Sequence, residues 1–253
     1  MRAAWLGGIA AALLLVAAPL ALPDPVATDF GAILAPPSAE HLLGTDQVGR
    51  DVLARLVVGA RLTLGTTLLT VLVTGVVGIA VGLAAGYRAG PVGGLVLRFV
   101  DLLAALPIVL FGLLATLVLG PGLGSLLAAV WLVGWTPFAR QTYQLTVAEA
   151  GREYVEGAVA LGAGTARVLG VHVVRNIAPA LVAHACLRFA GTLLTVSGLS
   201  FLGLGVQPPT PEWGAMVAEG REFVFAAPHL VLAPSLAVVL VAGAATALGR
   251  RLG

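Results

Sequence analysis

Long apolar runs alternate with short polar stretches along the whole sequence. Most of these runs approach or exceed the ~20 residues that a helix needs to cross the hydrocarbon core of a bilayer. The fourth run is shorter, and its helix is expected to extend through Arg140. The pattern predicts an all-α, polytopic membrane protein with about six transmembrane helices in a single transmembrane domain, residues 1–253. The expected spans are approximately 4–22, 62–86, 97–119, 125–138, 177–204 and 230–248.

The first apolar run permits two interpretations, a cleaved signal peptide or a retained first span. It is long enough to cross a bilayer, and five further apolar runs follow it. We therefore favour a retained helix, preceded by Arg2 on the cytoplasmic side.

Between the first two runs, residues 23–61 are polar and rich in proline. The spacing of Asp46 with Arg50, and of Asp51 with Arg55, suits ion pairs one helical turn apart. Apolar residues occupy the opposite face, so residues 41–61 are expected to form an amphipathic helix at the outer membrane surface. A simple connector is the alternative. The apolar positions are Val48, Leu53, Leu56 and Val57.

Composition supports a membrane protein and excludes several kinds of chemistry. Only 10% of the residues are charged, against about 25% in soluble domains. The net charge of +2 gives little electrostatic basis for binding nucleic acid. All 14 basic residues are arginine, which rules out a lysine-containing phosphate-binding loop and a lysine Schiff base in this chain. Any ATP-driven work would need a separate subunit to hold the ATP.

The distribution of arginine predicts the orientation in the membrane. With the N-terminus inside, nine arginines fall on cytoplasmic segments, four fall outside, and Arg188 lies within a span. The outer four are Arg50, Arg55, Arg61 and Arg221, and the cytoplasmic nine are Arg2, Arg88, Arg98, Arg140, Arg152, Arg167, Arg175, Arg250 and Arg251. This arrangement places the segment between the fourth and fifth spans in the cytoplasm.

That segment, Arg152–Gly164, combines charged residues with many small ones. We expect a helix over 152–161, ended by Gly162 in a left-handed conformation. Thr165 would then cap a second helix that reaches about Val174. Two short helices between membrane spans could form a rigid surface on which a soluble partner docks, although an ordinary cytoplasmic loop is the alternative.

Four motifs carry a resemblance to a known family. Glu156-Gly157-Ala158 followed by Gly162 resembles the EAA---G motif, and Arg152–Val155 resembles its REYV lead-in. Residues 41–51 resemble the block HxLGTDxxGRD, and residues 200–214 resemble SFLGLGVxPPTPxWG. Together they resemble the inner-membrane permease subunits of ABC importers for dipeptides, oligopeptides or nickel. The likeness covers roughly residues 40–249, and the order and spacing of the motifs make it specific.

The resemblance implies a six-span permease half with a transport core at about 62–249 and a coupling loop at about 150–174. A homologous permease would complete the pathway by forming a heterodimer with this chain. Two ATPase subunits would bind ATP and Mg²⁺, and an extracytoplasmic binding protein would deliver peptide or nickel. This chain itself would bind no cofactor and would not be an enzyme. The implied ATPase-docking residues are Glu153, Glu156, Gly157, Ala158, Gly162 and Ala163.

Two positions depart from the family pattern. Gly157 replaces the usual second alanine of the motif, which should preserve close approach but weaken the helix. Arg175 stands where many members have proline, so the exit from the coupling segment is expected to differ in shape.

Candidate residues for the substrate pathway lie on the fifth span. Arg188 is costly within a bilayer and would face a cavity or a partner. It could meet a peptide carboxylate, or it could pair with a neighbouring subunit or extend toward the interface. Ser197 and Ser200, further along the span, are assigned to the pathway with it. No dedicated metal site is predicted, because the histidines are dispersed: His41, His172, His184 and His229.

Two further residues have competing interpretations. Asp101 could be a functional intramembrane acid, but an ion pair with Arg98, three residues earlier, is the simpler account. Trp213 lies in the expected outer loop, residues 207–228, and could anchor that loop at the membrane interface.

Two other classes of function compete with an importer subunit. An intramembrane hydrolase could use Ser200 and His184, but their separation of 16 residues is about 24 Å along a helix, beyond hydrogen-bond reach. A secondary transporter or channel subunit would work without ATP. The dependence of transport on ATP discriminates between these alternatives.

Overall fold

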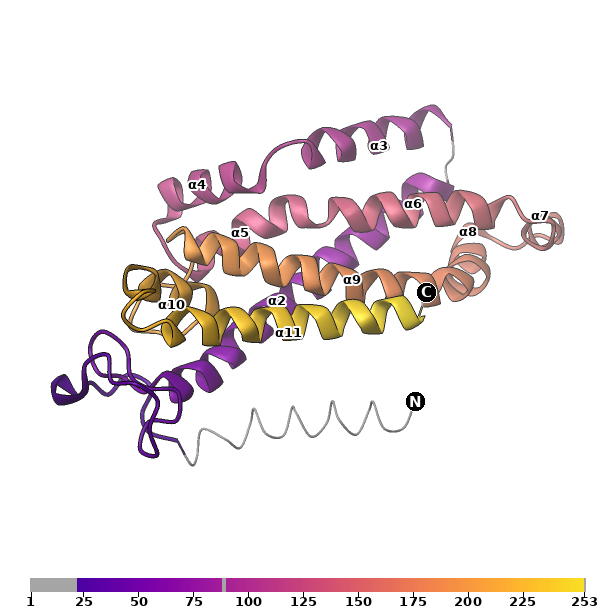
Figure 1. Ribbon diagram of the computed structural model, residues 1–253. Helices are drawn as coiled ribbons and strands as arrows, with labels where there is room; N and C mark the ends of the chain where they lie inside the picture. The colour runs from indigo at the N-terminus through magenta and orange to yellow at the C-terminus, as the bar shows by residue number, and fades with distance from the viewer. Residues whose placement is uncertain (1–21, 88–89, 253) are drawn as a thin grey trace. The chain divides into compact units, whose positions relative to one another are not determined.

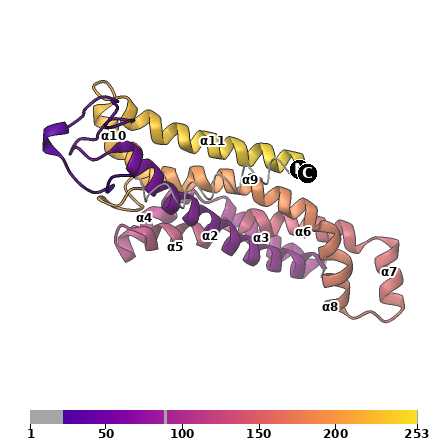
Figure 2. The same ribbon diagram turned by 90° about the horizontal axis from the view of Figure 1, so that it is seen from below.

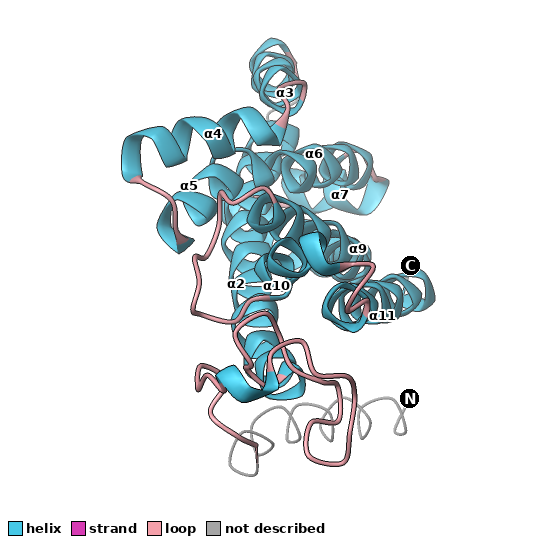
Figure 3. Ribbon diagram, turned by 60° about the vertical axis from the view of Figure 1, so that its left-hand side comes forward, coloured by secondary structure: helices cyan, strands magenta, loops and turns pink. Residues whose placement is uncertain are grey.

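The computed structural model describes residues 22–87 and 90–252, which fold into helices joined by loops (Figures 1 and 3). No β-strand forms within these two ranges, where Thr45 and Asp51 make an isolated bridge. The predicted first span at about 4–22 lies outside the described residues, apart from its last position. The helices are η2 (Phe30–Ala32), α2 (Val52–Tyr87), α3 (Pro91–Ala104), α4 (Ile108–Leu119), α5 (Leu123–Gly134), α6 (Thr136–Ala150), α7 (Glu153–Ala160), α8 (Thr165–Arg167), η3 (Val168–Val173), α9 (Val174–Phe201), α10 (Trp213–Gly220), η4 (Arg221–Phe223) and α11 (His229–Leu252).

The chain divides into two compact units, each built from several stretches of sequence. Unit 1 contains the described residues up to Thr67 together with Ala115–Leu126 and Leu193–Val241. Unit 2 contains Leu68–Leu114, Leu127–Thr192 and the described residues from Ala242 onward. Long helices such as α2 and α9 contribute residues to both units.

Several helices are long and apolar enough to cross a membrane. Four such stretches occur among the described residues, and α3 with α4 would make a fifth. The prediction of an all-α protein with several spans is therefore confirmed, with the count of six approximate. The four stretches are Val52–Tyr87, Leu123–Ala150, Thr165–Phe201 and His229–Leu252.

The segment before the second span differs from the expected surface helix. Residues 41–51 form turns, and α2 begins only at Val52. Gly44 and Gly49 have φ angles of 73° and 79°, which a right-handed helix does not contain. Asp51 accepts a hydrogen bond from the Ala54 amide at 2.7 Å, as a residue before a helix start does. The second span therefore starts ten residues earlier than predicted, at 52 rather than 62.

The predicted third span is two helices rather than one. Pro91 occupies the first turn of α3, where its missing N–H costs nothing. The chain leaves the helix before Pro107, and α4 then starts at an angle of 76° to α3. In α3, Asp101 pairs with Arg140 of α6 at 2.9 Å, so the expected partner Arg98 was wrong.

Small residues allow α2 and α6 to pack closely within unit 2. Gly78, Gly82 and Gly86 follow one another at intervals of four and so share one face of α2. A β-carbon at Gly82 would lie 2.5 Å from the Ala139 carbonyl oxygen. One at Gly78 would lie 2.4 Å from the Trp135 carbonyl oxygen. The backbones of the two helices are in contact here, which is the role of regularly spaced glycines between membrane helices.

Candidate functional site

The predicted docking segment is a short helix with one buried side and several exposed side chains. Helix α7 begins at Glu153 and ends at Ala160, with both glutamates in its first turn. Negative charge is favourable there, because the amides at a helix N-terminus carry partial positive charge. Glu153, Glu156 and Gly157 are exposed, whereas Val155 is only 2% exposed. These three predicted docking residues thus lie on accessible surface, as docking requires.

Val155 anchors α7 to an apolar cluster in unit 2. Its buried partners come from the segment after the loop and from the start of α9: Val168, Val173, Ile177 and Leu181. Figure 2 shows α7 and α8 as neighbouring helices beyond the end of α6. The cluster fixes which side of α7 faces the protein and which side faces outward.

Gly162 ends α7 in the conformation predicted from the sequence. Its φ angle is 85°, in the left-handed region that favours glycine. The Gly162 amide bonds to the Val159 carbonyl at 2.9 Å, and the Ala163 amide bonds to the Ala158 carbonyl at 3.0 Å. This pair of bonds is the Schellman motif. Ala158 and Ala163 are half-buried and Gly162 is exposed, so the three lie together at the end of the helix.

The second half of the loop differs from the prediction. Gly164, rather than Thr165, precedes the helix, and no side chain caps it. Residues Val168–Val173 then adopt a π-helix, which leads directly into α9. The expected separate helix ending near Val174 is thus the first part of a continuous helical stretch, Thr165–Phe201. Arg175 continues this helix as an exposed residue, a position at which proline would restrict the backbone.

The departure at Gly157 leaves open space on α7. A β-carbon added there would meet nothing within 4 Å. The alanine usual in the family would therefore fit without any rearrangement, so the glycine is not required by packing within the described chain.

A polar cluster links α6, α7 and α9 within unit 2. The Tyr154 hydroxyl donates to Glu149, and the Asn176 side-chain amide donates to Glu149 at 3.1 Å and to Tyr154 at 2.6 Å. The same amide donates to the His172 carbonyl at 2.9 Å. The hydrogen bond to Glu149 raises the pKa of Tyr154 above its ordinary value, because the phenolate would lose that bond and lie beside a carboxylate. We call Glu149, Tyr154 and Asn176 the Tyr154 cluster.

The sequence analysis did not single out Glu149 or Asn176. The sequence gives a weak indication of a role for Glu149 and Asn176, because each is a polar residue at the end of a stretch of mainly apolar or small residues. Their partnership joins positions 27 residues apart, a separation that helical periodicity does not address.

A groove lies beside α7 in unit 2. It has a volume of ≈ 590 Å³ and is lined by the ends of α2 and α6 and by one side of α7. Glu156 is its acidic residue, and most of the other lining residues are apolar or small: Gly86, Tyr87, Val147, Ala150, Gly151, Val155, Val159 and Ala160.

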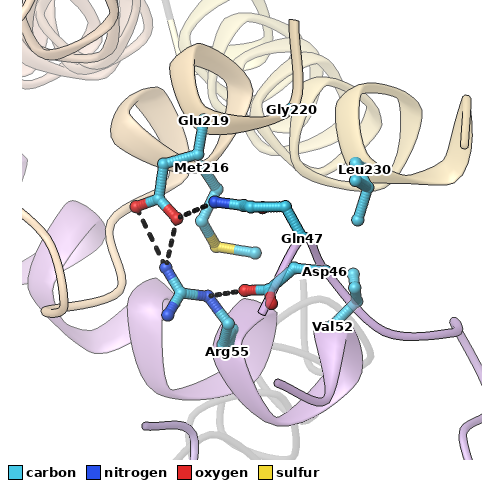
Figure 4. A pocket seen from close by; sticks show the side chains of 8 residues that line it. All are labelled: Asp46, Gln47, Val52, Arg55, Met216, Glu219, Gly220 and Leu230. Atoms are coloured by element: carbon cyan, nitrogen blue, oxygen red, sulfur yellow. Dashed lines mark hydrogen bonds and ion pairs between the residues drawn. The ribbon is translucent and has the colours of Figure 1, made fainter. Parts of the chain in front are cut away.

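A second polar site, in unit 1, joins the turns before α2 to α10 (Figure 4). Arg50 pairs with Asp46 at 2.6 Å and with Glu219 at 2.6 Å. Arg55 approaches the same two acids at 3.6 Å and 3.1 Å. Gln47 adds a hydrogen bond to Glu219 at 3.3 Å. Two cations and two anions are thus balanced with little exposure to solvent, as a buried charge cluster requires.

The sequence foresaw one contact of this ion cluster. Asp46 and Arg50 do pair, but across a turn rather than along a helix. Asp51 does not pair with Arg55; it accepts from Ala54 and lies 2.9 Å from the His41 ring nitrogen. Trp213 is buried, and its indole donates to the Leu56 carbonyl at 2.9 Å, so it packs within unit 1 rather than anchoring an exposed loop.

The three predicted pathway residues lie on α9 in different surroundings. Arg188 is half-buried in unit 2, and no carboxylate among the described residues pairs with it. Ser197 and Ser200 lie in unit 1, where both hydroxyls are buried and have no hydrogen-bond partner within the described chain. Their role in a pathway stays a prediction.

No group of three metal-ligating side chains gathers anywhere in residues 22–87 and 90–252. His41 lies beside Asp51, and His184 stacks edge-on against Phe138 with ring centroids 5.2 Å apart. His172 and His229 lie on η3 and α11.

Comparison with known proteins gives a consistent result. Residues 78–253 match the model of the family described as binding-protein-dependent transport system inner membrane component. The chain is 38% identical over 246 residues to the di/tripeptide transport system permease protein DppC of Pseudomonas aeruginosa, with 93% of this chain and 81% of that protein covered. It is 44% identical over 215 residues to the dipeptide transport system permease protein DppC of Escherichia coli K12, covering 83% and 72%.

A solved structure shares the fold. The methionine ABC transporter MetNI, in an inward facing conformation, aligns with a TM-score of 0.56 at 18% identity, over 79% of this chain and 96% of the aligned chain. The family match spans well over half of the sequence and both relatives exceed 30% identity. The chain therefore belongs to the family of binding-protein-dependent transport system inner membrane components.

Proposed function

We propose that this chain is a permease subunit of an ATP-driven importer that moves di- and tripeptides across the cytoplasmic membrane. The relatives at 38% and 44% identity are peptide permeases by name. The observation that supports the proposal is the exposed, glycine-ended helix α7, in which Glu156 and Gly162 resemble the corresponding residues of the EAA---G motif.

The proposed assembly contains four kinds of subunit. This chain pairs with a homologous permease, and two ATPase subunits bind ATP and Mg²⁺ on the cytoplasmic side. A binding protein delivers the peptide from outside. Docking is assigned to Glu153, Glu156, Gly157, Ala158, Gly162 and Ala163, of which the first three and Gly162 are exposed. The N-terminus is proposed to lie in the cytoplasm, which the excess of arginine on the cytoplasmic segments supports.

Reconstituted transport tests this proposal. The complete complex would be placed in proteoliposomes, with its binding protein added outside. Uptake of a labelled dipeptide would be measured with and without ATP in the lumen, which the ATPase subunits face. Uptake should require both ATP and the binding protein. Uptake driven by an ion gradient without ATP would instead indicate a secondary transporter, and uptake of Ni²⁺ without competition from dipeptide would indicate a nickel importer.

A variant of the docking helix separates the role of this chain from that of its partners. Gly162→Trp forces a large side chain into the left-handed conformation on the proposed docking surface. The chain should still insert into the membrane, while co-purification with the ATPase, or uptake coupled to it, should be lost. Full transport by this variant would contradict the docking assignment.

A further inference from the structure

Two kinds of contact connect the docking helix α7 to the start of α9. One is the buried contact of Val155 with Val173 and Ile177, which are 0% and 4% exposed. The other is the Tyr154 cluster, in which Asn176 of α9 donates to both Tyr154 and Glu149. These contacts connect α7 to the start of α9 in addition to the backbone of residues 161–173.

The polar contacts are concentrated on one carboxylate. The Glu149 side chain is 12% exposed and accepts from Tyr154 and Asn176, while its second oxygen pairs with Arg152 at 3.0 Å. Hydrogen bonds to a charged acceptor are stronger than neutral ones. The cluster therefore holds α6, α7 and α9 at a common point.

The hydrogen bonds of Asn176 to Tyr154 and Glu149 connect α7 to α9 across the π-helix. The π segment Val168–Val173 lies directly before α9, and Asn176 donates to the carbonyl of His172 within it. π-helical turns are rare and occur frequently at functional sites. A push on α7 could be absorbed by rewinding this segment unless α7 is fixed to α9 beyond it, as the Tyr154 cluster does.

We propose that Tyr154, Glu149 and Asn176 are positioning residues that transmit the displacement of α7 to α9. When an ATPase moves α7, the cluster and the buried layer beneath it carry the movement across the π segment to the first turn of α9. The apolar layer transmits force because close-packed side chains resist compression. The inference rests on the proposed function, since it requires an ATPase docked on α7.

The test compares transport with ATP hydrolysis in the reconstituted complex. Tyr154→Phe and Asn176→Ala remove the hydroxyl and the amide of the cluster. Each is expected to lower the dipeptide taken up per ATP hydrolysed by about five-fold or more, the lower end of typical coupling energies. The double variant should be little worse than either single one, because both break the same connection. Glu149→Gln keeps an oxygen acceptor and should retain more coupling than Glu149→Ala.

Arg175→Gln is the matched control. Arg175 is exposed, lies next to Asn176 in the same turn, and makes none of the hydrogen bonds or ion pairs of the cluster in the described structure. Co-purification of the ATPase and the thermal midpoint of the complex are measured for every variant. A role in coupling leaves both nearly unchanged for Asn176→Ala, whereas a merely stabilising role lowers the thermal midpoint and leaves uptake per ATP unchanged.

The outcomes separate this inference from the proposed function. Absence of ATP-dependent dipeptide uptake by the unaltered complex would refute the proposed function. Normal uptake per ATP in Tyr154→Phe and Asn176→Ala, with the unaltered complex active, would overturn the positioning role alone. Equal losses in Arg175→Gln and Asn176→Ala would also overturn it, because the effect would then not depend on the cluster.

Discussion

Arg188 is a basic side chain in the middle of the apolar helix α9, and no carboxylate of the described residues pairs with it. A charge within a membrane span is costly and usually faces a cavity or a partner. Substrate peptides carry a terminal carboxylate, which a guanidinium binds through paired hydrogen bonds. We propose that Arg188 meets that group, and pairing with a neighbouring subunit is the alternative.

Replacing Arg188 by glutamine should lower peptide uptake by about ten-fold, the loss that corresponds to one hydrogen bond to a charged group. ATPase co-purification and pairing with the second permease should persist. Cys186→Ala is the control, because Cys186 is half-buried on the same helix and carries no charge. Normal uptake by Arg188→Gln would exclude a role in the pathway, and loss of the permease pair would indicate that Arg188 binds an acidic residue of the partner.

At the scale of single residues, the sequence predicted conformations better than contacts. The left-handed Gly162 was foreseen, because a glycine after a run of helix-forming residues has a local physical meaning. The partner of Asp101 was not foreseen, because Arg140 lies 39 residues away. Trp213 was placed at an interface for the same reason, since its partner Leu56 is 157 residues distant. Contacts of this range depend on the packing of helices, which residue spacing does not specify.

At the scale of elements, the contact between α2 and α6 depends on glycine at particular positions of α2. Gly82→Ala would place a methyl group 2.5 Å from the Ala139 carbonyl oxygen. The helices would have to separate, at a cost of about 1–3 kcal/mol for overpacking. The thermal midpoint of the purified complex should fall accordingly.

Gly65→Ala is the matched substitution on the same helix, where an added β-carbon meets nothing within 4 Å. It should be neutral or slightly stabilising, because alanine favours the helix over glycine. Equal thermal midpoints for Gly82→Ala and Gly65→Ala would show that the close approach of α2 and α6 is not needed for stability.

At the scale of elements, hydropathy located the spans but not their ends or their breaks. The helix starting at Val52 was split in the prediction, because its first residues read as amphipathic. The 76° bend between α3 and α4 and the π segment Val168–Val173 were not predicted. The bend lies before Pro107, a helix-breaking residue that hydropathy alone does not register. The π segment, VLGVHV, carries no comparable signal in its sequence.

For the whole molecule, the arginine distribution predicts on which side of the membrane each loop lies. Leu161, next to Gly162, is 91% exposed, and Phe225, after η4, is 99% exposed. The prediction places Leu161 in the cytoplasm and Phe225 outside. Single cysteines at these positions, introduced with Cys186→Ala, should therefore react differently with a membrane-impermeant maleimide.

In intact spheroplasts, Phe225→Cys should be labelled and Leu161→Cys protected, and both should react after the membrane is opened. The reverse pattern would invert the proposed orientation and move α7 away from any cytoplasmic ATPase. Labelling of both in intact cells would contradict a membrane-spanning connection between the two positions.

Fold class and family were the properties most accessible from sequence at this scale. Length and charge of the apolar runs specify a helical membrane protein, and the motifs around Glu156 and Ser200 identify the family. The division of α2 and α9 between two compact units was not predicted. It depends on which helices approach one another, and amphipathic patterns are weak in helices that are apolar on all sides.

The ion cluster of unit 1 has a consequence for the order in which the protein matures. Arg50 and Arg55 leave the ribosome long before Glu219, their acidic partner from α10. Until Glu219 has been made, Asp46 is the one acid of the cluster that is present, so the cluster cannot form completely before α10 has been synthesised. The ion cluster thus closes as a late event, and a chain truncated before residue 219 would lack the carboxylate that Arg50 and Arg55 share.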